Sequence, residues 1–327
     1  MKPAVIGLSI LALLASAAAQ ELWHDPSPHR TQFVQVDDAV QLEVLDWGGT
    51  GPALVFLAGY MTAHAYDDLA PKLTNIGHVY GITRRGLGAS SRPSTGYSAR
   101  QSAKDVLLVL DHLGLEKPVL IGHSFGGQDL SFLGANYPDR MAALVYLNSA
   151  EDTSIGPVVL EPELRLLIRE VPPRPDKSSF NAYRLWQQKT YGMAFPESEL
   201  RQLYAADPDG SVGKYLVSDE VRQAMFEGLE RPEYSRIRVP VLAFFAVPAA
   251  LDEQMKKYHP QTAEQGMQLG LKYGLSLAWV ADNVAALKRG VPDARVLNLG
   301  GANNYIFFSN EADVVRELDS FVKTLPR

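Results

Sequence analysis

The stretch PVLIGHSFGG, residues 118–127, decides how the rest of the chain is interpreted. Its first four residues form a short apolar run, which is typical of a strand buried on both faces of a parallel sheet. Gly122 and Gly126 stand two residues before and after Ser124, and helical spacing follows over residues 127–137. A serine on a tight strand-to-helix turn needs such small neighbours, since larger side chains would collide with the adjoining strand and helix. The G-x-S-x-G pattern is common by chance, but this setting predicts a turn that presents Ser124 rather than glycines needed only for packing.

Strand and helix signals alternate on both sides of this turn. Apolar runs predict strands within 32–47 (two of them) and at 53–57, 78–83, 118–121, 142–147, 239–247 and 295–299. Helical spacing occurs at 65–75, 101–113 and 127–137, and a final amphipathic helix is expected at 311–323. This order predicts an α/β protein whose mostly parallel sheet is flanked by helices on both faces.

The alternation breaks at about Asn148. Residues 151–234 are rich in helical signals, which the prolines at 172, 173 and 175 interrupt. A helical block inserted late in an α/β sheet predicts a cap over the carboxyl ends of the strands. We therefore expect a core in two parts, 20–150 and 235–327, with a helical cap between them.

The first 19 residues differ from the rest. Lys2 precedes an apolar run over residues 4–15, and three alanines at 17–19 precede the polar Gln20. This order is typical of a secretory signal peptide, and an apolar core of about a dozen residues is too short to span a bilayer. We expect cleavage near Ala19, export to the periplasm or the medium, and no membrane contact afterwards.

Composition argues against two classes of protein. The net charge is −6 over 327 residues, and no basic stretch is available to neutralise phosphates, so we do not expect nucleic-acid binding. The chain has seven histidines and no cysteine, and neither an HExxH motif nor a Cys/His spacing is present. The sequence therefore predicts neither a metal site nor an organic cofactor.

The chain resembles the α/β-hydrolase superfamily over nearly all of residues 32–323. The resemblance rests on the GHSFGG turn and on the TRRG segment at 83–86, and it is to exported bacterial single-domain serine hydrolases. It implies an α/β-hydrolase fold and hydrolysis of a small carboxylic ester through an acyl-enzyme on Ser124. It also implies that the backbone amides of Phe125 and Tyr60 stabilise the oxyanion.

The resemblance further predicts a histidine after the last strand and a carboxylate that orients it. The loop GGANNYIF, residues 300–307, has Asn304 at the histidine position, and no histidine follows His259. The carboxylate position falls on Ala249 or, if the acid follows the preceding strand, on Asn148. Neither predicted group is at its expected place.

Three carboxylates lie near the two acid positions and could substitute, namely Asp252, Glu151 and Asp152. Of these, Asp252 is retained as the candidate acid. Asparagine at 304 cannot act as a general base, because its amide nitrogen has no available lone pair. Losing the base of such a triad costs about a million-fold in turnover, on the order of 8 kcal/mol.

The sequence leaves three interpretations open. His259 could supply the base; the chain could be a ligand-binding pseudoenzyme; or it could be an altered form of an active esterase. A scaffolding role is a weaker option.

Several other side chains are expected to be structural and not catalytic. His64 is expected to be an ordinary loop histidine, and Arg84 and Arg85 are expected to stabilise the fold. Four aromatic residues of the cap are expected to line an apolar pocket or to pack the cap onto the sheet (Phe180, Tyr183, Trp186 and Tyr191).

Overall fold

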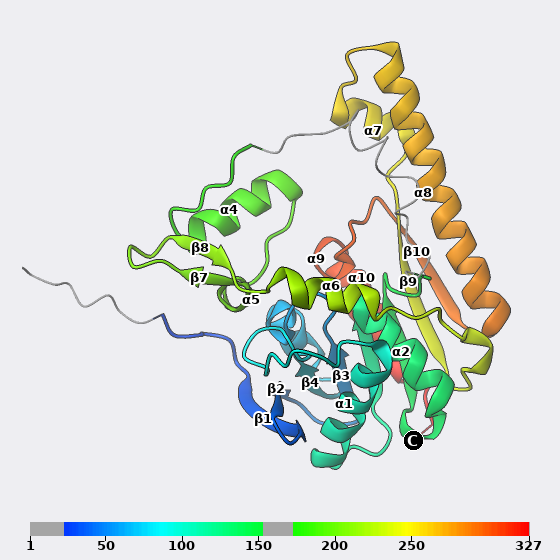
Figure 1. Ribbon diagram of the computed structural model, residues 1–327. Coiled ribbons are helices and arrows are strands. Elements are labelled where there is room, and N and C mark those ends of the chain that lie inside the picture. Colours follow the sequence, from blue (N-terminus) through cyan, green and yellow to red (C-terminus); the bar gives the residue numbers. More distant parts are fainter. Residues whose placement is uncertain (1–22, 153–172, 327) are drawn as a thin grey trace, which may run out of the picture.

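The computed structural model describes residues 23–152 and 173–326, and a twisted sheet lies at its centre (Figure 1). The described part of this sheet has eight strands in the order β1-β2-β4-β3-β5-β6-β9-β10. Their bounds are β1 Arg30–Asp37, β2 Val40–Gly48, β3 Ala53–Leu57, β4 His78–Ile82, β5 Val119–His123, β6 Ala143–Leu147, β9 Val241–Val247 and β10 Arg295–Gly300. The pairs β1–β2 and β2–β4 are antiparallel and the others are parallel, which confirms the predicted α/β sheet.

Helices cover both faces of the sheet. One face packs against α1 Ala99–His112, α2 Phe125–Asn136 and α8 Ala263–Gly290. The other face packs against the short 3-10 helices η1 Ala63–Tyr66 and η2 Ala70–Leu73, and against α9 Ile306–Ser309 and α10 Glu311–Val322. Two further 3-10 turns are η3 Pro138–Arg140 and η5 Tyr234–Arg236. No helix in the described ranges is both long and apolar enough to cross a membrane.

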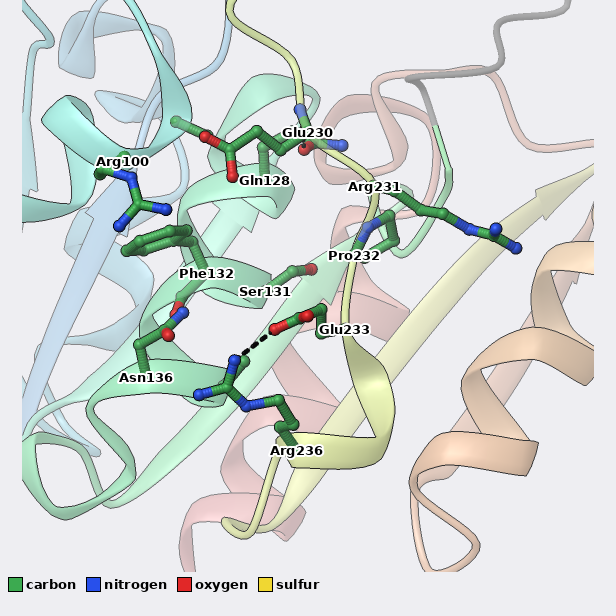
Figure 2. A pocket seen from close by; sticks show the side chains of 12 residues that line it. Arg100, Gln128, Ser131, Phe132, Asn136, Glu230, Arg231, Pro232, Glu233 and Arg236 are labelled. Atoms are coloured by element: carbon green, nitrogen blue, oxygen red, sulfur yellow. Dashed lines mark hydrogen bonds and ion pairs between the residues drawn. The ribbon is translucent and has the colours of Figure 1, made fainter.

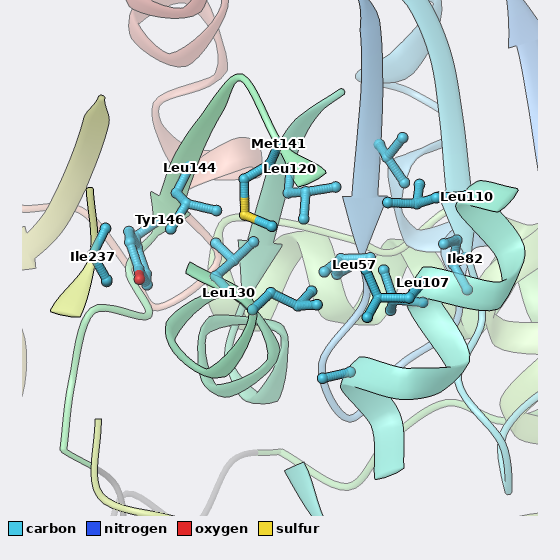
Figure 3. Packing of buried hydrophobic residues seen from close by; sticks show 14 of the residues in the cluster. Leu57, Ile82, Leu107, Leu110, Leu120, Leu130, Met141, Leu144, Tyr146 and Ile237 are labelled. Carbon is cyan, nitrogen blue, oxygen red and sulfur yellow. The ribbon is translucent and has the colours of Figure 1, made fainter. Parts of the chain in front are cut away.

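Alternation along the strands builds the two cores. In β5, Leu120 faces one core while Val119 and Ile121 face the other, because successive side chains of a strand point to opposite faces. Figure 3 shows the first core, where Leu130 of α2 lies beside Leu120 and near Leu144 of β6. The continuous apolar runs of the sequence therefore correspond to strands buried on both faces.

The segment 65–75, for which one helix was predicted, holds two separate 3-10 turns instead. Pro71 lies in the first turn of η2, and a proline interrupts a helix because it has no N–H to donate. The first turn, η1, contacts β2 and β4; it contains His64, and Asp67 follows it directly, and both belong to the polar cluster described below.

Between β6 and β9 the described residues form a small layer beside the core (Figure 1). It contains α4 Phe180–Tyr191, α5 Glu197–Leu203, the antiparallel pair β7 Tyr204–Ala206 and β8 Val212–Tyr215, and α6 Asp219–Glu227. The hairpin was not predicted, because strands of three and four residues are too short to show alternation. Residues 1–19 and 153–172 lie outside the described residues, so the signal peptide and that part of the cap stay predictions.

Candidate active site

Ser124 occupies the turn between β5 and α2 in a strained backbone conformation. Its φ is +53° and its ψ is −123°, which lies in the positive-φ part of the Ramachandran plot that residues other than glycine rarely occupy. A Cβ on Gly122 would lie 2.7 Å from the carbonyl carbon of Gly126, and one on Gly126 would lie 2.2 Å from the carbonyl oxygen of Leu57. Both glycines are therefore required by close backbone contacts, as the motif predicts.

The loop after β3 passes directly over the serine. A Cβ on Gly59 would lie 2.6 Å from the Cβ of Ser124 and 3.1 Å from the amide nitrogen of Phe125. Within the described residues, the backbone amides of Tyr60 and Phe125 donate to no acceptor. Two unpaired N–H groups, one of them at the N-terminus of α2, are what an oxyanion requires.

Asn148 and Asn304 meet at the carboxyl ends of β6 and β10. The Nδ2 of Asn148 donates to the Oδ1 of Asn304 at 2.9 Å, and the Oδ1 of Asn148 accepts from the amide of Ala246 at 2.8 Å. Asn148 has a φ of +52°, so its backbone turns sharply as it leaves the sheet. Of the two acid positions considered from the sequence, the structure brings the one after β6 against Asn304.

His123 supports the loop after β10 and does not serve the serine. Its Nε2 lies 3.0 Å from the carbonyl oxygen of Asn304, and its ring packs against Tyr305 and Phe307 at centroid distances of 5.1 and 5.2 Å. Burial lowers the pKa of His123 to about 4, so the ring is neutral at pH 7. The hydroxyl of Ser124 makes no hydrogen bond to any described residue, His123 included, and the one hydrogen bond given for the imidazole is to the Asn304 carbonyl.

Asp252 is not brought to the site, which corrects its assignment as the candidate acid. It lies in the first turn of α7 Leu251–Tyr258, its side chain is 72% exposed, and its partner is Lys256 at 3.7 Å. His259, the alternative base, is exposed at the end of the same helix and makes no hydrogen bond with Ser124. In Figure 1, α7 lies at the end of α8 that projects away from α2.

The other two candidate carboxylates, Glu151 and Asp152, contact α8 and the segment before β9. Glu151 is half-buried, and desolvation, opposed by a hydrogen bond from Trp279, raises its pKa to about 7. Asp152 pairs with Arg231 at 3.3 Å, and its amide donates to Asn283 of α8. The partners of Asn304 among the described residues are instead Asn148, through its side chain, and His123, through its backbone carbonyl.

A cavity of about 390 Å³ lies between the site and the cap. Tyr60 of the loop over the serine and Tyr305, the neighbour of Asn304, connect it to the residues described above. Asp219 and Arg222 form an exposed ion pair of 2.7 Å at its edge. The remaining lining is largely apolar and aromatic (Met61, Phe195, Leu203, Tyr204, Tyr215 and Val217). Such a lining suits a small apolar or aromatic group.

The cap aromatics predicted as possible pocket residues do not line this cavity. Phe180 and Tyr183 are buried with Leu200 in the core of the cap. Trp186 stacks on Tyr183 at 5.6 Å and contacts Tyr191 edge-on at 5.3 Å. These side chains therefore pack against one another within the cap, and Tyr191 is half exposed, so their contacts differ from both roles considered from the sequence, which were lining a pocket and packing the cap onto the sheet.

A second cavity, of about 260 Å³, is polar and lies along α2 (Figure 2). Phe132 carries the guanidinium of Arg100 over its ring at 5.1 Å, and Glu233 pairs with Arg236 at 2.5 Å. The hydroxyl of Ser131 donates to the carbonyl of its own helix at Gly127. None of the lining residues belongs to the turn at Ser124, so this cavity is separate from the candidate active site.

The two arginines of the TRRG segment hold the helices beside the site. Arg84 pairs with the buried Asp129 of α2. Arg85 makes a bidentate pair with Asp105 of α1, with both N···O distances at 2.6 Å. These pairs tie the TRRG segment to α1 and α2, and the guanidinium of Arg84 also lies over the ring of Phe125 at 5.8 Å.

Glu199 of α5 links the cap to the loop over the serine. Its carboxylate accepts from the amide of Thr62 at 3.1 Å and from the Thr62 hydroxyl. Burial raises the pKa of Glu199 to about 7, although the hydrogen bonds from Thr62 oppose this shift. A buried carboxyl group that is partly protonated near neutral pH therefore joins the cap to the end of the loop after β3, called the oxyanion loop below.

This raised pKa predicts a pH-dependent stability. Between pH 4.5 and about 7 the unfolded chain releases the Glu199 proton while the native state keeps it, so the free energy of unfolding falls as pH rises. The slope from this group is at most about 1.4 kcal/mol per pH unit. Urea unfolding at pH 5, 6, 7 and 8 should show the fall in the parent and a flatter curve in Glu199→Gln. Glu197→Gln, on the same helix but half-buried and paired with Arg201, is the control, and equal slopes in all three proteins would contradict the assignment.

The comparisons with known proteins agree with this geometry. The family model described as alpha/beta hydrolase fold matches residues 52–191. The 2-(acetamidomethylene)succinate hydrolase of Mesorhizobium japonicum is 30% identical over 31% of this chain and 36% of its own length. The fluoroacetate dehalogenase of a Burkholderia species is 35% identical over 31% of this chain and 35% of its own. The chain thus spans little more than a third of the length of each of these two relatives.

Solved structures match over a larger part of the chain. The crystal structure of E-2-(acetamidomethylene)succinate hydrolase covers 90% of this chain and 100% of its own, with a TM-score of 0.65 and 20% identity. An aryl esterase structure from Burkholderia cenocepacia covers 90% of this chain with a TM-score of 0.58 and 18% identity. At such identities the likeness shows the fold alone.

Sheet order, the strained serine turn and the oxyanion loop together define a protein of the α/β-hydrolase fold. The family model for this fold covers residues 52–191, and the two curated relatives named above are a hydrolase and a dehalogenase of small molecules.

Proposed function

We propose that the protein binds a small carboxylic ester, or a related carbonyl compound, at Ser124 and does not hydrolyse it at the rate of a serine hydrolase. The observation that carries this proposal is the 2.9 Å hydrogen bond between Asn148 and Asn304. These are the two positions at which the superfamily resemblance implies the acid and the base. With amides at both, the hydroxyl of Ser124 has no proton acceptor in the described structure.

The parts that recognise a carbonyl group support the binding half of the proposal. The turn at Ser124 keeps its strained conformation, and the amides of Tyr60 and Phe125 stay unpaired within the described residues. The cavity beside Tyr60 offers an aromatic surface for the acyl or alcohol part of the ligand. Export, predicted from residues 1–19, would place this binding outside the cytoplasm.

Working hydrolysis with a substitute base is the competing function. It requires a titratable group near Ser124, and the exposed position of His259 on α7 gives that role no support. An altered form of an active esterase would have the same geometry as a natural pseudoenzyme, and the test below applies to both.

The test compares the parent with Ser124→Ala, using p-nitrophenyl butyrate as the probe. We expect no turnover above background in either protein, because neither has a base, together with saturable quenching of aromatic fluorescence by the probe. The structural reason for the quenching is that Tyr60 and Tyr305 line the cavity. Rapid hydrolysis by the parent that Ser124→Ala abolishes would overturn the proposal in favour of an active esterase. Absence of both turnover and quenching would remove esters as the ligand class.

A further inference from the structure

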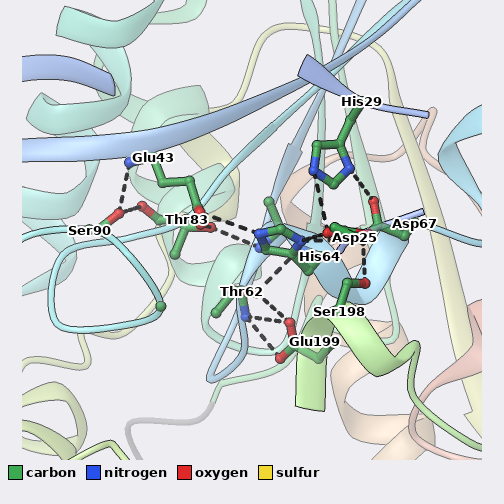
Figure 4. Close-up of polar contacts among 12 residues, drawn as sticks. Asp25, His29, Glu43, Thr62, His64, Asp67, Thr83, Ser90, Ser198 and Glu199 are labelled. Carbon is green, nitrogen blue, oxygen red and sulfur yellow. Dashed lines mark hydrogen bonds and ion pairs between the residues drawn. The ribbon is translucent and has the colours of Figure 1, made fainter. Parts of the chain in front are cut away.

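A cluster of two histidines and two aspartates lies next to Ser198 of α5 (Figure 4). Asp25 and His29 come from the segment before β1; His64 lies in the turn η1 that follows the loop over Ser124, and Asp67 caps the end of that turn. Each offers one ligand atom, and these atoms lie within 4.8 Å of one another. The side chains of His29, His64 and Asp67 are at most 5% exposed, and that of Asp25 is 23% exposed.

The distances match those between the ligands of a small cation. His64 Nδ1 lies 3.3 Å from Asp67 Oδ2 and 3.5 Å from Asp25 Oδ2, and His29 Nε2 lies 3.7 Å from Asp25 Oδ2. Tetrahedral zinc with bonds of about 2.0–2.1 Å separates its ligand atoms by about 3.3 Å. Small side-chain adjustments would therefore bring the four atoms to bonding distance around one centre.

The other ring nitrogens have the partners that metal-bound histidines require. His64 Nε2 lies 3.3 Å from Glu43 Oε1, and His29 Nδ1 lies 2.7 Å from Asp67 Oδ1. Ligating histidines almost always donate their second N–H to a carboxylate, a carbonyl or water, which fixes the tautomer and the ring orientation. Two contacts orient Asp67 further: the indole N–H of Trp47 donates to it at 3.0 Å, and so does the hydroxyl of Ser198 at 2.5 Å.

Charge favours a cation at the same place. Three carboxylates, those of Asp25, Glu43 and Asp67, surround two imidazoles in a largely buried space. Buried carboxylates are costly unless a positive charge or several donors compensate them. A divalent cation would supply that charge while leaving both imidazoles neutral, which is the form that binds metals.

We infer that Asp25, His29, His64 and Asp67 form a structural site for a divalent cation of the zinc type. Four protein ligands leave no open position for a substrate or a reactive water, which separates a structural zinc site from a catalytic one. The bound ion would fasten the segment before β1 to the turn η1 and, through Ser198, to helix α5 of the cap. This inference does not rest on the proposed function.

The test uses the purified chain, stripped with EDTA and titrated with Co²⁺ and then Zn²⁺. We expect one equivalent of Co²⁺ to bind with the strong visible absorption of four-coordinate cobalt, and Zn²⁺ to displace it. Removing one ligand in His29→Gln should weaken Co²⁺ binding by about 100-fold or more and abolish the four-coordinate spectrum. His78→Gln is the matched control, because His78 also pairs with a carboxylate, Asp46 at 2.7 Å, but lies outside the cluster. The control should bind Co²⁺ as the parent does.

Two results would overturn the inference. One is binding of less than a tenth of an equivalent of either metal by the folded parent, in which case the cluster is a buried charge network only. The other is an unchanged cobalt spectrum in His29→Gln. If His29→Gln does not fold, Asp25→Asn tests the same point at the most exposed ligand. The melting temperature of the parent gives an independent measurement, since a metal that binds only the native state must raise it.

Discussion

The double variant Asn148→Asp/Asn304→His is expected to hydrolyse p-nitrophenyl butyrate roughly 10⁴-fold faster than the parent or more. The two side chains already face each other at 2.9 Å across the carboxyl ends of β6 and β10. Replacing both amides would therefore create a carboxylate–imidazole pair with the orientation largely in place. A correctly oriented imidazole can take the proton of Ser124, while the oxyanion loop needs no change.

The single variants separate the roles of the two positions. The hydrolysis rate of Asn304→His alone should rise much less than that of the double variant. An imidazole without its carboxylate partner is not held in the tautomer and orientation that catalysis needs. Asn148→Asp alone should gain nothing, since it supplies no base for Ser124. Adding Ser124→Ala to the double variant should remove the gain. A folded double variant that is as inert as the parent would show that the turn at Ser124 is not arranged for acyl transfer.

The substitution Asp105→Ala is expected to lower the free energy of unfolding by about 3–5 kcal/mol. Arg85 and Asp105 are 5% and 2% exposed, and two N···O contacts of 2.6 Å join them. Removing the carboxylate leaves the guanidinium buried without its counter-charge, and that uncompensated charge dominates the cost. Urea unfolding followed by circular dichroism measures the change.

The matched control is Asp111→Ala on the same helix, α1. Asp111 also pairs with an arginine, Arg140 at 2.5 Å, but its side chain is 58% exposed. An exposed pair is screened by water and salt, so this control should lose less than about 1 kcal/mol. Equal losses in the two variants would show that the TRRG segment does not depend on its buried pair.

The core of the fold could be predicted because its strands are apolar and short. The runs ALVFL and ALVYL correspond to β3 and β6, and PVLI overlaps β5. The turn at Ser124 was predictable for a related reason. Close backbone contacts on each side of the serine exclude any side chain, so the sequence has glycine at both positions. Local sequence is sufficient where burial on both faces or close backbone contact leaves few alternatives.

The final helix was predicted at 311–323 and corresponds to α10, but the helices between β9 and β10, α7 and α8, were not predicted. α8 runs for 28 residues, yet only three of its side chains are buried, namely Leu269, Asn283 and Leu287. Its exposed positions include Met267 and Leu271, so apolar residues do not mark one face clearly. A helix with so little contact with the core leaves a weak periodic signal, because that signal arises from burial.

The sequence predicted which positions belong to the candidate site, but it did not predict which side chains contact one another there. Counting along the chain identified Asn148 and Asn304, but only the folded sheet shows that their side chains bond to each other. Asp252 was chosen because it is close in sequence, whereas α7 directs it to solvent. The His/Asp cluster had no recognisable motif, because its members form two separate pairs in the sequence, at residues 25 and 29 and at 64 and 67.

The amide pair at the end of the sheet also has a consequence for how the protein responds to acidity. A carboxylate–imidazole pair changes its charge as the pH crosses the range near neutrality, and a ligand beside it is held more or less tightly as it does so. Asn148 and Asn304 have no such transition, and the neighbouring His123 is neutral above about pH 4. The floor of the site therefore presents the same dipoles to a ligand in mildly acidic and mildly alkaline surroundings.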